Sequence, residues 1–306
     1  MRLLLLITLL APALLRAAEL PKELRARFPA KVEKQLLAIQ AKGEPLLLRE
    51  IAAWLPAVPD NQNAAEHLQH LNELLKDDKV FKQRMALSKK RRELKLVGFD
   101  PLPDEYLVEL KKMLESQRAI LEAIHETVTR KQFKSNEDFE KGQSRFVREL
   151  LVLKTASNLL TAEATWRAHQ RKASAGDSLL AQIVMAKYLD NEPTLIARLV
   201  QTAVIGISLQ PTSRVLSADV LTAKQLKALQ LAHARIDVPS LMPRTYASER
   251  CLLTSKFFLP KKELIEFEKG VTQFMFFPRP FDKPEQALKE RTDKHRHQDL
   301  SLMLAK

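Results

Sequence analysis

The chain has few of the residues that build tight turns and β-strands. Only six glycines and three tyrosines occur in 306 residues, and runs of β-branched residues are rare. Hairpin turns favour glycine, and strands are enriched in β-branched and aromatic side chains. We therefore predict an all-α protein, a multi-helix antiparallel bundle-like array with essentially no sheet.

The same shortage of glycine excludes several enzyme motifs. The scattered glycines form neither a glycine-rich phosphate loop nor a dinucleotide-binding fingerprint. The Gly-x-Ser-x-Gly turn that carries the nucleophile of many serine hydrolases is also missing. We predict no cofactor and assign no catalytic residue.

Cysteine is nearly absent as well. Cys251 is the only one, so the chain cannot form an internal disulfide and its stability must come from the helical core. Cys251 could act as a nucleophile, but it lies in an apolar helical pattern beside Leu252 and Leu253. A buried, unreactive thiol is the better interpretation.

Long apolar runs are missing after the first 18 residues. Residues 1–18 have Arg2 as a short positive start, a run from Leu3 to Leu10 that is apolar except for Thr8, and small residues towards Ala18. This pattern is typical of a secretory signal peptide, and the run is short for a bilayer span of about 20 residues. We predict an exported protein of the periplasm or cell envelope, which contacts a membrane only if this segment is not cleaved.

Basic residues exceed acidic ones by 50 to 37, which gives a formal net charge of +13. Loss of Arg2 and Arg16 with residues 1–18 would lower it to +11. The excess is spread along most predicted helices, with one concentration at Lys89, Lys90, Arg91 and Arg92. This cluster could bind an anionic envelope polymer, or it could be a solvated helix face. The export signal counts against nucleic acid as a partner.

The predicted helices divide into a region of short helices, residues 19–100, and a main helical domain, residues 101–306, unless one domain covers 19–306. The most regular part runs from Asp177 to Ile236, where a capping box at Thr222 and Gln225 predicts a helix start. One helix there carries apolar residues at steps of three and four, which predicts that they lie in the core. These residues are Ile196, Leu199, Val200, Ala203, Val204 and Ile207.

Histidine supplies the only candidate metal ligands. His67 and His70 lie one helical turn apart with Glu66 nearby, so their imidazoles could share an ion. The zincin motif needs histidines four residues apart, and no third ligand can be named. Two surface histidines explain this pair better, and a solvated basic end explains His295 and His297. We therefore predict no metal.

Two segments resemble a known group of proteins. The first runs from Gly43 through Trp54 to Pro59 and Ala65, and the second from Gly176 through Asn191 and Pro193 to Leu231. They resemble exported, helix-rich bacterial proteins typical of planctomycete and verrucomicrobial genomes. The resemblance implies a helical fold and export, and it implies no activity and no site residue.

These observations favour an exported, non-catalytic helical protein that acts as an interaction or structural component of the cell envelope. Its partner would be a protein or an anionic envelope component. One alternative is a hydrolase whose site is assembled from distant helices, with Glu66, His67 and His70 as its nucleus. The other is a binder of anionic polymer through Lys89, Lys90, Arg91 and Arg92.

Overall fold

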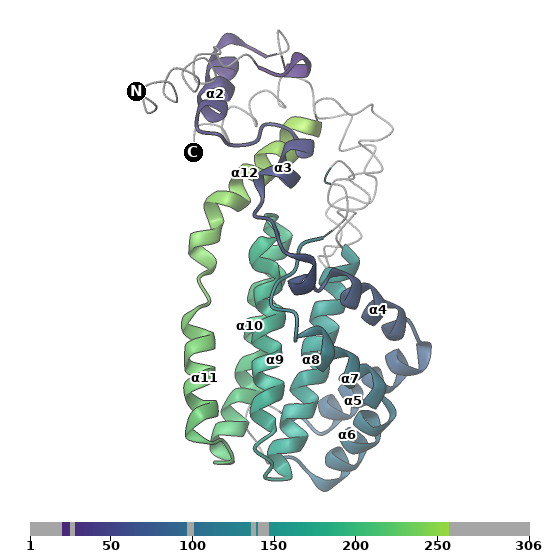
Figure 1. Ribbon diagram of the computed structural model, residues 1–306. Helices are drawn as coiled ribbons and strands as arrows, with labels where there is room; N and C mark the ends of the chain where they lie inside the picture. The colour runs from purple at the N-terminus through teal and green to yellow at the C-terminus, as the bar shows by residue number, and fades with distance from the viewer. Residues whose placement is uncertain (1–19, 25–27, 97–100, 136–138, 140–146, 257–306) are drawn as a thin grey trace. The chain divides into compact units, whose positions relative to one another are not determined.

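A computed structural model describes residues 20–24, 28–96, 101–135, 139 and 147–256 (Figure 1). The predicted signal segment 1–18, His295 and His297 lie outside these residues. Within them all regular structure is helical, apart from one isolated bridge between Asn63 and Gln132. The all-α prediction is confirmed. None of the described helices has both the length and the apolar character needed to cross a bilayer.

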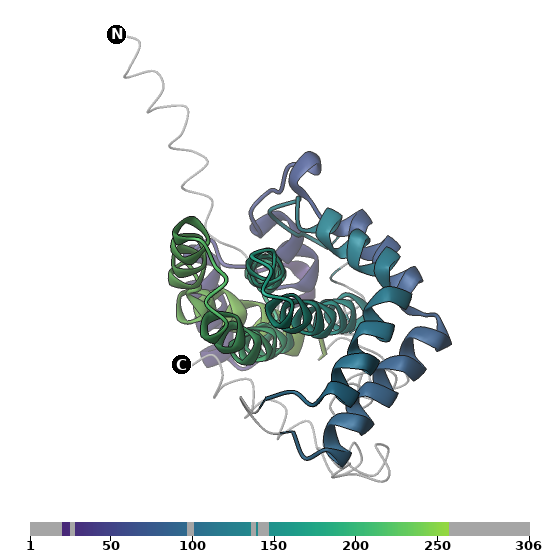
Figure 2. The same ribbon diagram turned by 90° about the horizontal axis from the view of Figure 1, so that it is seen from below.

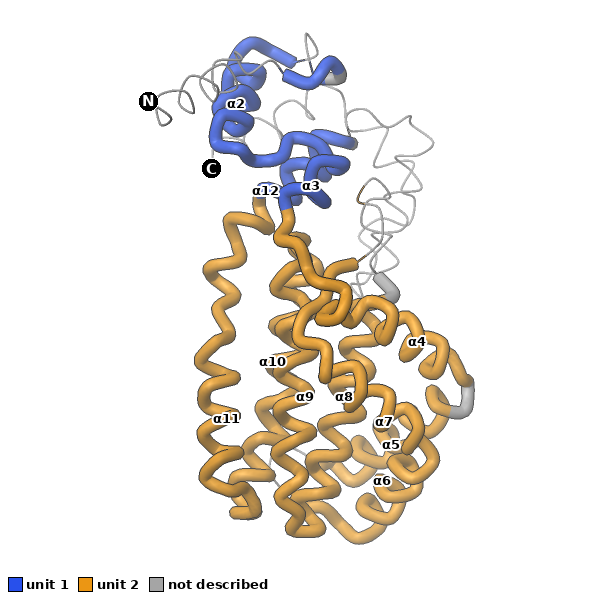
Figure 3. The backbone as a smooth tube through the Cα atoms, in the orientation of Figure 1, with its two compact units in different colours: residues 1–54, 247–306 blue, residues 55–246 orange. Residues whose placement is uncertain are grey.

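The chain divides into two compact units (Figure 3). Unit 1 comprises residues 1–54 and 247–306, and unit 2 comprises residues 55–246. The predicted boundary at residue 100 falls inside unit 2. There α5 (Asp78–Glu93) packs against α6 (Asp104–Ser116), across that position.

Unit 1 contains η1 (Lys22–Leu24), α2 (Ala30–Ala41), α3 (Leu48–Trp54) and the last part of α12 (Val238–Lys256). Pro29 precedes α2, and Gly43 follows it with a positive φ of 72° that an L side chain rarely adopts. Its core cluster is apolar: Leu20, Leu24, Phe28, Val32, Leu36, Ile39, Leu46 and Leu47.

Cys251 is fully buried in this unit, as predicted. Its Sγ donates a hydrogen bond to the carbonyl of Pro45, at 3.0 Å. Burial raises the pKa of the thiol to about 12, so the reactive thiolate is not formed at neutral pH.

Three helices that pack against one another form the centre of unit 2: α8 (Val147–His169), α9 (Ala175–Tyr188) and α10 (Leu195–Ser217). Figures 1 and 2 show them side by side. Helix α11 (Ala223–Ala234) packs on α9, whereas α4 (Ala65–Leu75), α6 and α7 (Arg118–Thr127) pack on α8. Short 3-10 turns lie at Asp60–Gln62 (η2) and Leu189–Asn191 (η4).

Helix α9 is buried on nearly all sides, and small residues let its neighbours approach. A Cβ atom at Gly176 would lie only 2.9 Å from the Cδ2 atom of Leu221, just before α11. Glycine at this position therefore permits the close packing of α11 on α9. The core cluster here contains Ala164, Ala168, Ala175, Leu179, Ile183, Val215 and Leu229.

The predicted core stripe of α10 is wrong in register. Of its six residues only Val204 is buried, and Leu199 is 55% exposed. The buried face carries Ala197, Arg198, Gln201, Val204, Ser208, Pro211 and Val215. Arg198, Gln201 and Ser208 thus face inward. The leucine and isoleucines of the predicted stripe are not buried.

The reason lies at the turn between α9 and α10. The last carbonyls of a helix lack partners in their own helix and must bond elsewhere when buried. Arg198 donates from Nη2 to the carbonyls of Leu189 and Glu192 and from Nη1 to Oε1 of Gln201. Gln201 in turn donates to the carbonyl of Ala186 and to Asp190. Burial of Arg198 and Gln201 satisfies these groups.

Burial lowers the pKa of Arg198 to about 10, although the negative charges of Asp190 and Glu192 oppose that shift. The guanidinium therefore remains charged at neutral pH. Its bonds hold the start of α10 against the end of α9 and so fix which face of α10 is turned inward.

The capping box predicted at the start of α11 is confirmed. The Thr222 hydroxyl accepts from the backbone N–H of Gln225, at 3.2 Å, and the Gln225 side chain accepts from the N–H of Thr222, at 3.1 Å. These bonds satisfy two N–H groups that have no partner within the helix.

Loss of this cap should destabilise the protein. We expect Thr222→Ala to lower the free energy of unfolding by about 1 kcal/mol, because an N-cap hydroxyl is removed. Urea denaturation followed by circular dichroism measures this change. Thr202→Ala is the control, since the Thr202 hydroxyl bonds a carbonyl within its own helix. Equal losses in both variants would contradict a specific role of the cap.

Candidate functional site

A cavity of about 230 Å³ lies in unit 2 between α5, α6, α8 and α10. We call it the arginine pocket, because three arginines line it: Arg84 and Arg91 from α5 and Arg214 from α10. None of the described residues that line it is an aspartate or glutamate. The complete lining is Phe81, Arg84, Met85, Leu87, Ser88, Arg91, Leu96, Leu102, Tyr106, Leu110, Met113, Asn158, Leu159, Thr161, Ala162, Thr165, Gln210 and Arg214.

The spacing of α5 directs two of these arginines to one side. Arg84, Ser88 and Arg91 follow one another at steps of four and three, which places them on one helix face. Leu87 lies on the same face, and Leu110 and Met113 of α6 line the apolar part of the pocket. The sequence shows this amphipathic spacing, but it gives no indication of which helices face it.

Arg84 is partly buried and has no polar partner among the described residues. Burial lowers the pKa of its guanidinium, and no neighbouring acidic charge opposes the shift. No hydrogen bond or ion pair joins it to another described residue. A guanidinium withdrawn from water without a carboxylate is energetically costly, so an anion would be favoured beside it.

The other two arginines lie near Tyr106 of α6. Burial raises the pKa of the Tyr106 phenol, and the positive charges of Arg91 and Arg214 partly oppose this effect. Arg91 also donates from Nη2 to Oε1 of Gln210, at 2.8 Å. Two guanidinium charges and a phenolic hydroxyl, all hydrogen-bond donors, therefore lie close together in the pocket.

The predicted basic cluster has four different environments at the end of α5. Lys90 pairs with Glu105 at 2.6 Å, and Lys89 lies 3.6 Å from Glu93. Arg91 lines the arginine pocket, whereas Arg92 is exposed. The helix thus divides the cluster between the pocket and the surface.

The candidate metal residues lie on α4. His67 accepts a hydrogen bond at Nε2 from Nε of Arg130, at 3.3 Å, while Glu66 and His70 line a different pocket, of about 420 Å³, with Glu149. A guanidinium that occupies the ring nitrogen opposes metal binding there. Among the described residues, no group of three or more histidine, cysteine, aspartate or glutamate side chains could hold a metal ion.

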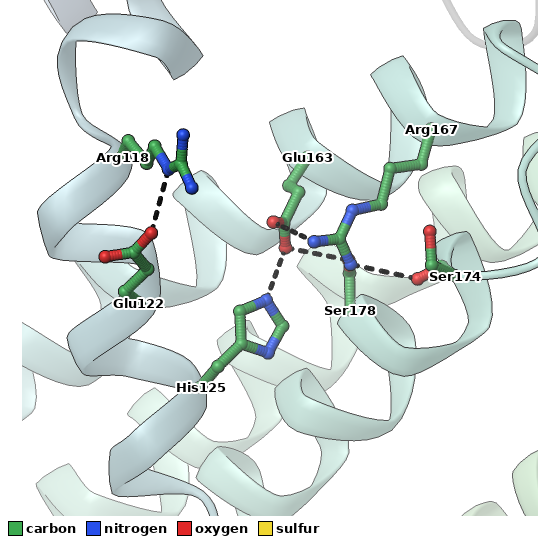
Figure 4. Close-up of polar contacts among 7 residues, drawn as sticks. All are labelled: Arg118, Glu122, His125, Glu163, Arg167, Ser174 and Ser178. Carbon is green, nitrogen blue, oxygen red and sulfur yellow. Dashed lines mark hydrogen bonds and ion pairs between the residues drawn. The ribbon is translucent and has the colours of Figure 1, made fainter.

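A buried carboxylate, Glu163 of α8, connects three helices (Figure 4). Its Oε2 lies 2.7 Å from Nε2 of His125 on α7 and accepts from the Ser178 hydroxyl of α9, at 2.8 Å. Its Oε1 pairs with Arg167 at 2.6 Å. Arg167 also donates to the carbonyl of Ser174 and to the Ser178 hydroxyl.

This network links three helices, and its geometry is not that of a catalytic serine hydrogen-bonded to a histidine base. His125 and Ser178 bond the same carboxylate oxygen and not each other, and Ser178 is fully buried. In the sequence His125 stands beside Glu126, whereas the folded protein pairs it with Glu163. Its partner lies 38 residues away, so no local spacing rule could have identified it.

The ionised state of Glu163 is favoured in the folded protein. Burial alone would raise its pKa, but the hydrogen bond and charge of His125, the charge of Arg167 and the hydrogen bond from Ser178 together lower it below its ordinary value of 4.5. Because the folded pKa is lower than the unfolded pKa, the carboxylate stabilises the fold above about pH 4.5. This contribution is lost as the pH falls through the folded pKa.

Replacement of this carboxylate should weaken the fold and reduce its sensitivity to acid. We expect Glu163→Gln to lower the free energy of unfolding by roughly 2 kcal/mol at pH 7, less than for a fully buried pair because His125 and Arg167 are partly exposed. The difference from the unmodified protein should shrink below about pH 4.5. Urea denaturation at several pH values measures both effects.

Glu122→Gln is the matched control. Glu122 pairs with Arg118 at 2.8 Å on the exposed surface of α7 (Figure 4), where an ion pair contributes little. A Glu163→Gln loss no larger than that of this control, or one independent of pH, would contradict the assigned role.

Comparison of the chain with known proteins finds no matching family model, no matching curated protein and no matching solved structure.

Proposed function

We propose that this chain is an exported helical binding protein of the cell envelope that holds an anionic ligand in the arginine pocket. One observation carries the proposal: three arginines, and no carboxylate among the described residues, line the cavity between α5, α6, α8 and α10. The signal-like residues 1–18 and the basic charge support export and attraction to anionic envelope components. The resemblance to exported bacterial proteins stays a prediction.

The energetic argument begins with Arg84. Its guanidinium loses hydration through partial burial, and no described residue supplies an anion to replace that water. A phosphate or carboxylate group accepts two parallel hydrogen bonds from a guanidinium, and these charge-assisted bonds are stronger than neutral ones. A bound anion would therefore supply at Arg84 the partner that the protein does not.

The remaining lining limits the kind of ligand. The cavity volume of about 230 Å³ equals the liquid volume of about eight water molecules. Leu87, Leu110, Met113 and Leu159 provide an apolar wall. We therefore infer that the arginine pocket binds a small ligand, or the end of a larger one, that combines an anionic group with a compact apolar group.

Phenyl phosphate is a suitable probe of this chemistry, and benzyl alcohol is an uncharged counterpart. We expect phenyl phosphate at a hundredfold excess over its Kd to raise the melting temperature by on the order of 5 °C, since a ligand that binds only the folded state stabilises it. Benzyl alcohol should have little effect. Calorimetric titration should give a Kd that rises with salt concentration.

Variants locate the binding site. Arg84→Gln and Arg91→Gln should each weaken phenyl phosphate binding about tenfold, because each removes charge-assisted hydrogen bonds. Arg92→Gln is the matched control, since it removes the same charge one residue along α5 from an exposed position. Equal affinities for Arg84→Gln and Arg92→Gln, or no binding by the unmodified protein, would contradict the proposal.

A second binding mode follows from the exposed part of the basic cluster. Lys89 and Arg92 lie on the surface at the end of α5 and could contact an anionic polymer too large for the pocket. We expect salt-sensitive retention on phosphocellulose, weakened by joint replacement of Lys89 and Arg92 with glutamine. Phenyl phosphate binding should be unchanged in this variant. Retention that does not depend on salt would exclude this mode.

A further inference from the structure

Helix α10 presents an apolar face to solvent. Leu199 and Leu209 are 55% and 59% exposed, and Leu195 and Leu216 are also exposed near the two ends of the helix. Thr202, Ala203 and Gly206 are exposed between them. At the helical spacing of 100° per residue these side chains lie on one side, opposite Val204, Ser208 and Val215. We call this surface the α10 face.

The α10 face carries no charge. The only charged residues from Leu195 to Ser217 are Arg198, which is buried, and Arg214, which lines the arginine pocket. In a chain with 28% charged residues and a net charge of +13, a helix face without charge is exceptional. A contact between two copies through this face would bring no charged residue of α10 into the interface.

Gly206, near the middle of the face, is not explained by the single chain. It has no positive φ, and a Cβ atom there would meet nothing within 4 Å. Glycine in a helix interior is less stable than alanine, and an alanine would fit. A glycine at the centre of a helix–helix contact instead allows the two backbones to approach closely.

Two of the four leucines lie almost symmetrically about this glycine: Leu195 is 11 residues before it and Leu216 is 10 residues after it. Leu195 and Leu199 precede it, and Leu209 and Leu216 follow it. If a second α10 crossed in the opposite direction at Gly206, Leu195 of one copy would lie opposite Leu216 of the other. A surface that matches itself in this way suits a two-fold dimer, in which both copies contribute the same face.

We propose that the α10 face joins two copies of this chain as an antiparallel dimer centred on Gly206. The proposal does not depend on ligand binding in the arginine pocket. A 23-residue helix is about 35 Å long, so one helix from each copy gives a small interface. We therefore expect a dimer with a Kd in roughly the micromolar range.

Sedimentation velocity of the purified protein between about 1 and 200 μM tests the dimer. Leu199→Glu should raise the dimer Kd at least tenfold, because it would bury a charge in the contact. Val108→Glu is the control: Val108 is 51% exposed on α6, outside the face, and its variant should dimerise normally. Melting temperature and circular dichroism verify that both variants fold.

Gly206→Ala distinguishes an effect on the dimer contact from an effect on the stability of the single chain. Under dilute conditions the variant should melt at a higher temperature, since alanine favours the helix and meets no neighbour. Its dimer Kd should nevertheless rise about tenfold, because the added methyl groups hold the helices apart. A general effect on folding would not move these two quantities in opposite directions.

Paired charge substitutions test the antiparallel orientation of the two α10 helices. Leu195→Glu and Leu216→Lys should each weaken the dimer, and the double variant should recover affinity relative to either one, because antiparallel packing places the new opposite charges together. A protein that stays monomeric throughout the concentration range would overturn the proposal and would indicate that its own chain covers the face. So would a dimer unaffected by Leu199→Glu, or a double variant weaker than both single variants.

Discussion

The arrangement of unit 2 depends on the polar contacts that begin helix α10. Arg198 bonds the carbonyls at the end of α9, and Gln201 bonds Ala186 and Asp190. Those carbonyls are buried, and leaving them without donors would destabilise the fold. α10 therefore turns its polar side inward, and its apolar side remains on the surface.

That choice of face connects the two proposals. With Arg198 inward, Gln210 and Arg214 lie along the side of α10 that borders α5, where Gln210 meets Arg91 and Arg214 completes the arginine pocket. The leucines around Gly206 become the α10 face. A single helix thus contributes to the candidate ligand site, through Gln210 and Arg214, and to the proposed dimer surface.

The Glu163 network provides stability of a different kind. It joins α7, α8 and α9 through one carboxylate with three partners, His125, Arg167 and Ser178, so its charge is compensated despite burial. Tyr188 acts similarly: its hydroxyl donates to the carbonyls of Thr127 and Arg130, which ties α9 to the end of α7. Polar bonds between residues distant in sequence therefore supplement an interior rich in alanine and leucine.

The sequence by itself determined the helical class, the unreactive state of Cys251 and the cap at Thr222, because these follow from composition, local burial pattern and neighbours within one helical turn. Only the tertiary structure decided which face of α10 is buried, that Glu163 meets His125, and that Arg84, Arg91 and Arg214 share one pocket. The Glu163–His125 pair and the arginine pocket depend on contacts between residues 38 or more positions apart. The buried face of α10 depends on the backbone groups that the end of α9 leaves unsatisfied. Periodicity reports where apolar residues recur, and it contains no information on which polar groups a neighbouring helix presents.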